Sequence, residues 1–218
     1  MAALKGAFIN VGAGLIGALP NIVIFQFNPD QVTRTPALAH TPDRADGSGS
    51  RPAGPQPDQP TQSISFTLRL DATDQLALGD PIAAASGILP ALSALEMLQV
   101  PKSSLTIDLF GLSKSAPKPY RHPPISLPTV LFFWGPFRIL PVTVNSLSIT
   151  ETEYDTLLNP IRAEVSVSLQ GLTPNQTKDS KLATGAYNYS QGVKEVMAAL
   201  NLANAAQLGV SSAVSFSL

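Results

Sequence analysis

The chain has 218 residues and a formal net charge of −1, so it can bury a sizeable core as one large domain or as two small ones. Only 13% of its residues are charged, which suits a surface covered by neighbours, although a Ser/Thr-rich β protein would have the same composition. It has no cysteine, which excludes disulfides and cysteine-based sites, and its basic residues form no cluster, which argues against a nucleic-acid partner.

The first twenty residues contain an apolar stretch after Lys5 that resembles a signal peptide only faintly, because Asn10 and three glycines interrupt it. No apolar run in the sequence reaches the length that spans a bilayer, so we expect no direct membrane insertion. We expect the chain to be made and folded in the cytoplasm.

Two strands are predicted near the N-terminus, over residues 5–11 and 22–28, with a glycine-rich connection between them. In the second strand, Val23, Phe25 and Phe27 should share one face, because side chains alternate between the two sides of a strand. The strand should end at Asn28-Pro29-Asp30, since proline cannot donate to a strand ladder.

A proline-rich arm is predicted over residues 35–62, with a Gly/Ser-rich centre and almost no large apolar residue after Leu38. Such a segment buries too little apolar surface to offset the entropy lost when it becomes ordered. Two interpretations remain open: the arm lies against a neighbouring subunit, or it is an exposed insertion without a function.

The clearest strand pattern covers residues 63–71, where apolar and polar side chains alternate strictly. After it, Asp80-Pro81 is typical of a helix start, with an N-cap followed by proline in the first turn. Gly87 and Pro90 should interrupt this helix, which leaves a firm portion over residues 90–99. We expect this helix to cover one end or face of a β-barrel.

The middle of the chain predicts one more strand over residues 105–110 and then a second proline-rich loop over residues 113–127. Three strands in succession follow, over residues 130–134, 142–150 and 163–170, and they predict an antiparallel meander. Within the second of these, the apolar phase slips by one residue at Asn145-Ser146. The slip indicates a β-bulge or a change of the surface that the strand faces.

Two segments in this sequence carry a family signature. One is Trp134-Gly135-Pro136-Phe137, followed by a Val/Thr/Ser-rich strand, a turn, and the segment from Pro160 and Arg162 to Leu169. The other runs from Phe25 to Arg34 and begins Phe-Gln-Phe-Asn-Pro. Together and in this order, they resemble the tail-tube and baseplate tube-initiator proteins of contractile injection systems, which are phage-tail-like particles. The turn Leu158-Asn159 departs from the Asp-Gly that family members often have.

The resemblance implies a mainly β fold: an antiparallel, tail-tube-like β-barrel or sandwich with one or two flanking helices, which completes a larger barrel by oligomerisation. It implies a homo-hexameric ring with a tube protein ring above, a spike protein below, and baseplate wedge or sheath proteins nearby, in a particle assembled in the cytoplasm and released by lysis. The residues that match the family become the candidates for subunit contact. They are Phe25, Phe27, Asn28, Pro29, Arg34, Trp134, Gly135, Phe137 and Arg162. Trp134 could equally be an ordinary core aromatic.

We predict a tail-tube-like domain over residues 1–172 and a C-terminal extension over residues 173–218. The extension should consist of a polar linker, 173–190, and a helix, 191–208, in which apolar residues recur at helical spacing. Some family members carry a LysM module at this end, but too few residues remain here for one.

No pattern in the sequence points to an enzyme, a cofactor or a metal site. His40 and His122 lack neighbouring ligands. Glu151 and Glu153 are one strand period apart, which should put both carboxylates on one side, but two acids at a strand end are usually a solvated rim. The Phe-x-Phe-Asn-Pro segment and the long arms favour a baseplate tube initiator over the main inner tube subunit. The alternative of another class is a monomeric β-sandwich that binds a ligand, which would need exposed aromatic residues on one face.

Overall fold

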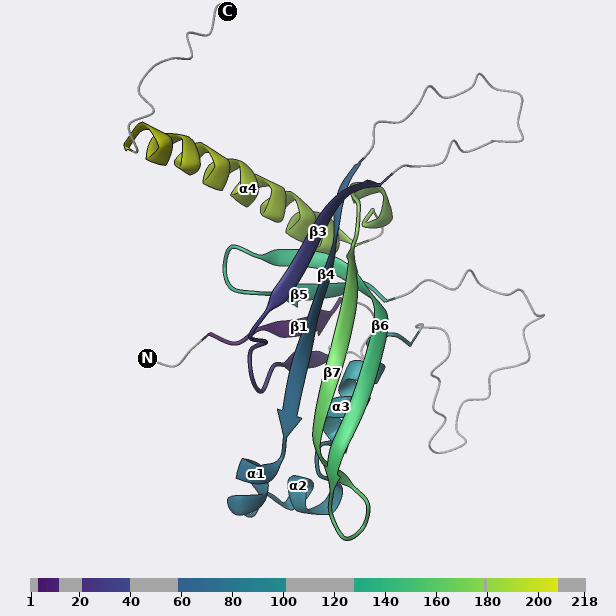
Figure 1. Cartoon of the computed structure of the whole chain (residues 1–218). Coiled ribbons are helices and arrows are strands. Elements are labelled where there is room, and N and C mark those ends of the chain that lie inside the picture. The colour runs from purple at the N-terminus through teal and green to yellow at the C-terminus, as the bar shows by residue number, and fades with distance from the viewer. Residues whose placement is uncertain (1–3, 12–20, 40–58, 101–127, 179, 208–218) are drawn as a thin grey trace, which may run out of the picture.

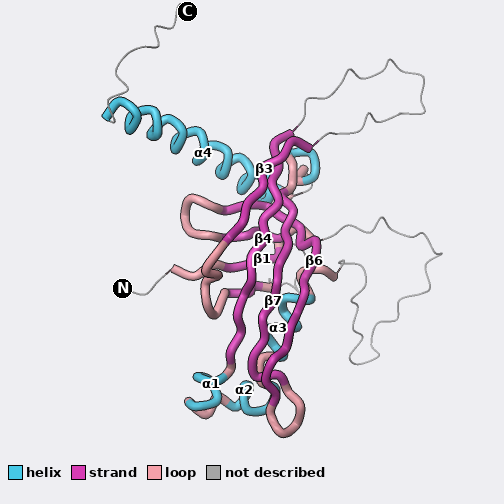
Figure 2. Tube along the Cα trace, viewed as in Figure 1, coloured by secondary structure: helices cyan, strands magenta, loops and turns pink. Residues whose placement is uncertain are grey.

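The computed structural model describes residues 4–11, 21–39, 59–100, 128–178 and 180–207. These residues form a seven-stranded antiparallel sheet with four α-helices and one short 3₁₀ helix, so the predicted mainly β class is confirmed (Figures 1 and 2). The strands are β1 (Ala7–Asn10), β2 (Ile22–Ile24), β3 (Val32–Ala39), β4 (Gln59–Asp71), β5 (Val130–Phe133), β6 (Ile139–Tyr154) and β7 (Pro160–Gly171). The helices are α1 (Thr73–Ala77), α2 (Pro81–Ser86), α3 (Leu89–Glu96) and α4 (Lys181–Gln207), with the 3₁₀ helix at Pro174–Gln176.

The sheet has the order β2-β1-β5-β6-β7-β4-β3 and folds over on itself along β6. The first residues of β6, Ile139 to Val142, pair with β5, and the rest of the strand pairs with β7. Figure 1 shows the result: β3, β4, β7 and β6 run side by side as long strands, while β1 and β5 cross behind them. We call the four long strands the polar layer and the three short strands the inner layer.

An aromatic cluster fills the space between the two layers. Its rings come from both layers, with centroid separations of 5.0 to 6.4 Å between neighbours. The members are Phe8, Phe25, Phe66, Phe132 and Trp134. The predicted inward set of β4, from Ile64 to Leu70, is buried beneath this cluster, as are Val165, Val167 and Leu169 of β7. Period-2 alternation thus placed the core face of both strands correctly.

The predicted meander of β5, β6 and β7 is confirmed, and so is the slip within its middle strand. The β6–β7 register shifts between Val144 and Ser146, where the sequence pattern had indicated a bulge. A second shift, between Glu151 and Glu153, was not predicted. It leaves Glu151 opposite Ala163 and Glu153 opposite Arg162, so the expectation that both carboxylates share one side is wrong.

Several predicted boundaries are wrong near the N-terminus. The strand predicted over 22–28 ends at Ile24; Phe25 is buried, but the side chain of Phe27 is 47% exposed, so the two rings do not share a face. The proline-rich arm predicted over 35–62 is strand at both of its ends, because β3 reaches Ala39 and β4 begins at Gln59. The rest of that arm lies outside the described residues, as do the predicted strand at 105–110 and the loop at 113–127.

The helix start at Asp80-Pro81 is confirmed by its cap. The Asp80 carboxylate accepts hydrogen bonds from the backbone amides of Ile82 and Ala83, at 2.8 and 3.2 Å. As predicted, Gly87 ends this helix, with a φ of +55°. The firm helix that follows, α3, buries Leu92 and Leu95 and lies against β2, where it covers the end of the inner layer.

The polar linker predicted over 173–190 is wrong, because α4 begins ten residues earlier, at Lys181. Ala183, Ala186, Tyr187 and Ser190 recur at helical spacing and are buried, so tertiary packing orders a segment whose composition resembles a linker. The second half of α4 projects away from the sheet (Figure 1) and exposes Val196, Met197 and Leu200.

Candidate assembly surface

The face of the polar layer that points away from the aromatic core carries two rows of hydroxyl groups, with rows of charged side chains toward the end of β4. Paired residues continue across the strands in rows, such as Thr33, Ser65, Ser168 and Ser146. In the next row, the hydroxyls of Thr67 and Ser166 lie 3.5 Å apart. This surface is concave and holds a cavity of about 1210 Å³. Its hydroxyl rows offer many weak polar contacts, and its charges of both signs form ion pairs toward one end.

The segment from Phe25 to Asp30 forms one wall of this concave surface. The Gln26 side chain accepts a hydrogen bond from the Asp71 amide at 2.9 Å and donates to the Asp71 carbonyl, so it substitutes for a paired strand at the end of β4. Asn28 ties the wall to the N-terminal segment, because its side chain accepts from the Gly6 amide and donates to the Leu4 carbonyl. Phe27 and Pro29 line the cavity on this wall.

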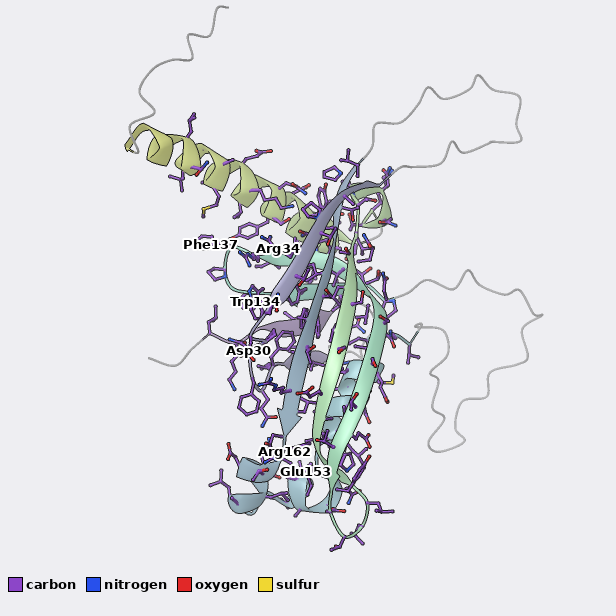
Figure 3. The ribbon with its side chains drawn as sticks, viewed as in Figure 1. Asp30, Arg34, Trp134, Phe137, Glu153 and Arg162 are labelled. Carbon is purple, nitrogen blue, oxygen red and sulfur yellow. The ribbon has the colours of Figure 1, made fainter. Side chains whose placement is uncertain are left out.

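Charged side chains close one end of the concave surface, where β4, β7 and β6 finish. Arg162 on β7 binds Asp71 through Nε and Glu153 through Nη1, both at 2.6 Å, and donates to the Thr73 hydroxyl at 3.3 Å (Figure 3). Desolvation acts to raise the pKa of Asp71, but hydrogen bonds from Thr73 and Arg162 outweigh it and hold the pKa below 3.8. One row above, Arg69 lies 3.4 Å from both Asp30 and Glu164.

Both outer margins of the polar layer lack a strand partner within the described part of the chain. β3 pairs only with β4 there, and each of its residues from Val32 to Leu38 is at least partly exposed. On the other margin, β6 pairs with β5 only as far as Val142, so its length from Asn145 to Tyr154 pairs on one side alone. Open sheet margins are ready templates for pairing with another chain.

The structure distributes the nine sequence candidates over four places. Phe25 and Trp134 belong to the aromatic core. Phe27, Asn28, Pro29 and Arg162 border the concave surface. Gly135, with a φ of +81°, and the 59% exposed Phe137 form the β5–β6 hairpin beneath α4, where the Tyr189 hydroxyl donates to the Pro136 carbonyl at 2.8 Å. Arg34 lies on β3 at the open margin (Figure 3).

Sequence reasoning missed three residues that take part in this surface. Gln26 and Asp71 carry the bridges at the end of β4, and their roles depend on a contact between positions 45 residues apart. Lys194 lies far from β3 in sequence, but α4 brings it to the groove beside Arg34. Of the three, only Gln26 could have been identified from the sequence, because it lies inside the Phe-x-Phe-Asn-Pro segment.

The described residues contain no group of three or more His, Asp or Glu side chains arranged to hold a metal ion. Likewise, no helix within the described ranges combines the length and the apolar character needed to cross a bilayer. A scan against protein-family models and a search of curated proteins found no match to this chain.

Proposed function

We propose that this chain is a structural ring subunit of a contractile injection system, the baseplate tube initiator that joins the spike to the inner tube. The observation that carries the proposal is the polar layer: a concave, hydroxyl-lined sheet with both margins open in the described part of the chain. Such a layer is unfinished as a monomer, and identical copies can finish it by pairing margin to margin.

Strand direction supports ring closure. The polar layer contains four antiparallel strands, so β3 and β6 run in opposite directions. When rotation about a central axis brings β3 of one copy beside β6 of the next, the junction is antiparallel like the others. Repetition then produces one closed sheet, with the hydroxyl-rich faces turned to the lumen and the helices outside.

A lumen with hydroxyl rows, and with arginines already paired to carboxylates, suits a conduit, since such a wall is hydrated without holding a passing protein by strong charge pairs. In this proposal six copies form the ring, the tube protein stacks above it, the spike binds below, and wedge or sheath proteins surround it. The resemblance of the Phe-x-Phe-Asn-Pro segment to initiators favours the initiator over the main tube subunit. The particle assembles in the cytoplasm, and the chain needs neither a catalytic group nor a cofactor.

The proposal is tested by sedimentation velocity and electron microscopy of the purified full chain and of particles from producing cells. We expect annular assemblies of six copies, and a ring at the spike–tube junction. Leu38 is 67% exposed on the open margin of β3, so Leu38→Asp should prevent ring formation. Leu78→Asp, at an 86% exposed position after α1, is the matched control and should leave rings intact.

A monomer in both preparations would contradict the proposal. If that monomer bound a small ligand in the 1210 Å³ cavity, the β-sandwich binding module would take its place. Rings found only as repeated layers along the tube would instead assign the chain to the main inner tube.

A further inference from the structure

A groove with two unpaired cations runs along β3 on the side that faces α4. It has a volume of about 940 Å³, and its lining includes Arg34, Pro36 and Leu38 of β3 together with Lys194 of α4. Among the described residues, no acidic side chain lies within ion-pair distance of either cation. Desolvation, and then the charge of Arg34, lower the pKa of Lys194. Two cations in one groove repel each other, so a carboxylate placed between them would be stabilised.

The opposite margin of the polar layer carries such a carboxylate on the same side of the sheet. Leu147, Ile149 and Glu151 of β6 lie opposite the buried residues Val167, Val165 and Ala163, so they face the side on which the core and α4 lie. Arg34 also faces this side, because it lies opposite the buried Ile64. In the described part of the chain, the one interaction of the exposed Glu151 carboxylate is with the Tyr154 hydroxyl.

The two bulges of β6 limit where a neighbouring strand can pair. Between them, Ser146 to Glu151 pairs regularly with β7, and the ladder is interrupted on either side. A slip of one residue would move every side chain of the strand to the opposite face of the sheet. Only slips of two residues therefore leave the same side chains facing the core. Few registers of β3 therefore remain within this window.

In one of these registers, three positions on the core side of β3 match their partners. When Arg34 lies opposite the neighbour's Glu151, Pro36 lies opposite Ile149 and Leu38 opposite Leu147, so charge meets opposite charge and apolar meets apolar. A slip of two residues in one direction sets Arg34 against Ile149 and moves Leu38 onto the bulge at Asn145. A slip in the other direction carries Arg34 past the bulge at Thr152, to Glu153, which faces the lumen side with Arg162.

We propose that Glu151 of a neighbouring copy binds between Arg34 and Lys194, and that this contact sets the register of the ring junction. The inference rests on the ring proposed above and adds the residues that align its copies. The groove is incomplete in a single chain, and the second copy supplies the anion that completes it.

Charge reversal tests the contact. Glu151→Arg should weaken ring association at least tenfold in sedimentation velocity, and Arg34→Glu should do the same. The double variant that exchanges the two charges should recover most of the loss. Glu96→Arg, on the exposed face of α3, is the matched control and should have no effect. All of these positions are exposed, so thermal unfolding of each variant should match the parent.

Cysteine cross-linking tests the register separately. The chain has no cysteine, so a disulfide between copies can form only at introduced positions. Arg34→Cys with Glu151→Cys should give a ladder of cross-linked copies on mild oxidation, and faster than Arg34→Cys with Ile149→Cys or with Leu147→Cys. Faster cross-linking at 149 or 147, or rings that tolerate Glu151→Arg, would overturn this inference and leave the ring proposal standing. Absence of rings from the parent chain and from particles would overturn both.

Discussion

The inner layer and the polar layer of the sheet differ in whether their margins are covered. At the end of the inner layer, α3 lies against β2, and the Asn21 side chain donates to the Ala94 carbonyl at 2.9 Å. The polar layer leaves the outer side of β3 and of most of β6 without a strand partner in the described chain. The apolar side of the sheet therefore stabilises the subunit, and in the proposed ring the open outer sides of β3 and β6 are where neighbouring copies pair. Substitutions in the two regions should separate stability from assembly.

The largest effect should come from the aromatic core. Phe132 is 2% exposed and contacts rings from both layers, so Phe132→Ala should lower the free energy of unfolding by about 4 kcal/mol, measured by urea denaturation. Phe137→Ala, at the 59% exposed hairpin position, should cost no more than about 0.5 kcal/mol. Equal losses at the two positions would contradict the claim that the buried ring of Phe132 contributes more to stability than the exposed ring of Phe137.

The turn between α2 and α3 should give the next largest effect. A Cβ atom at Gly87 would lie 2.1 Å from the Pro160 carbonyl oxygen, and that oxygen accepts the Ile88 amide at 2.9 Å. Gly87→Ala should therefore lower the free energy of unfolding by about 3 kcal/mol, from the clash and the positive φ together. Gly79 has a φ of +72° but no atom near its Cβ position, so Gly79→Ala should cost only about 1 kcal/mol. Similar losses at both glycines would show that Gly87 does not lie tightly against the Pro160 carbonyl of β7.

A stabilising change is expected at the β6–β7 turn of the polar layer. Leu158, where the chain departs from the family's Asp-Gly, has a φ of +64° and is 79% exposed. Leu158→Gly should raise the free energy of unfolding by about 1 kcal/mol, because glycine adopts this conformation without strain. The Asp155 carboxylate, which accepts the Leu157 and Asn159 amides, should hold the turn in both forms. Leu157→Gly should bring no gain, and a gain there would contradict the strain argument.

The smallest effect should be the pH-dependent one at Arg162. Asp71 has a lowered pKa in the folded chain, so its ion pair stabilises above the ordinary value of 3.8 and is lost as the pH falls through the lower folded value. Arg162→Gln should lower Tm by about 3 °C at pH 7, and the difference from the parent should vanish in strong acid. Arg69→Gln removes more exposed pairs and should change Tm less. A difference that persists in strong acid, where the carboxyl of Asp71 is protonated, would assign the effect to packing.

The alternation of apolar and polar residues predicted β4, β7 and the bulge at Asn145-Ser146, because each signal lies within one strand. The sequence did not predict β3, since Asn28-Pro29-Asp30 and Pro36 resemble loop composition while pairing with β4 decides the conformation of this segment. It also placed the start of α4 ten residues too late, because Thr, Asn, Tyr and Ser in the first turns hide a buried stripe. The groove between Arg34 and Lys194 depends on how α4 crosses β3, and local pattern carries no such information.

The interrupted ladder of β6 also bears on how the chain avoids misassembly. Fibril growth by strand addition needs a long, flat sheet margin along which any segment can extend. Here the regular stretch is only Ser146 to Glu151, bounded by two bulges that increase the local twist. A short strand such as β3 fits that length, while a longer unfolded segment meets a break at either end. In the proposed ring, the bulges would thus leave this margin open to β3 of a neighbouring copy and limit pairing with longer unfolded segments.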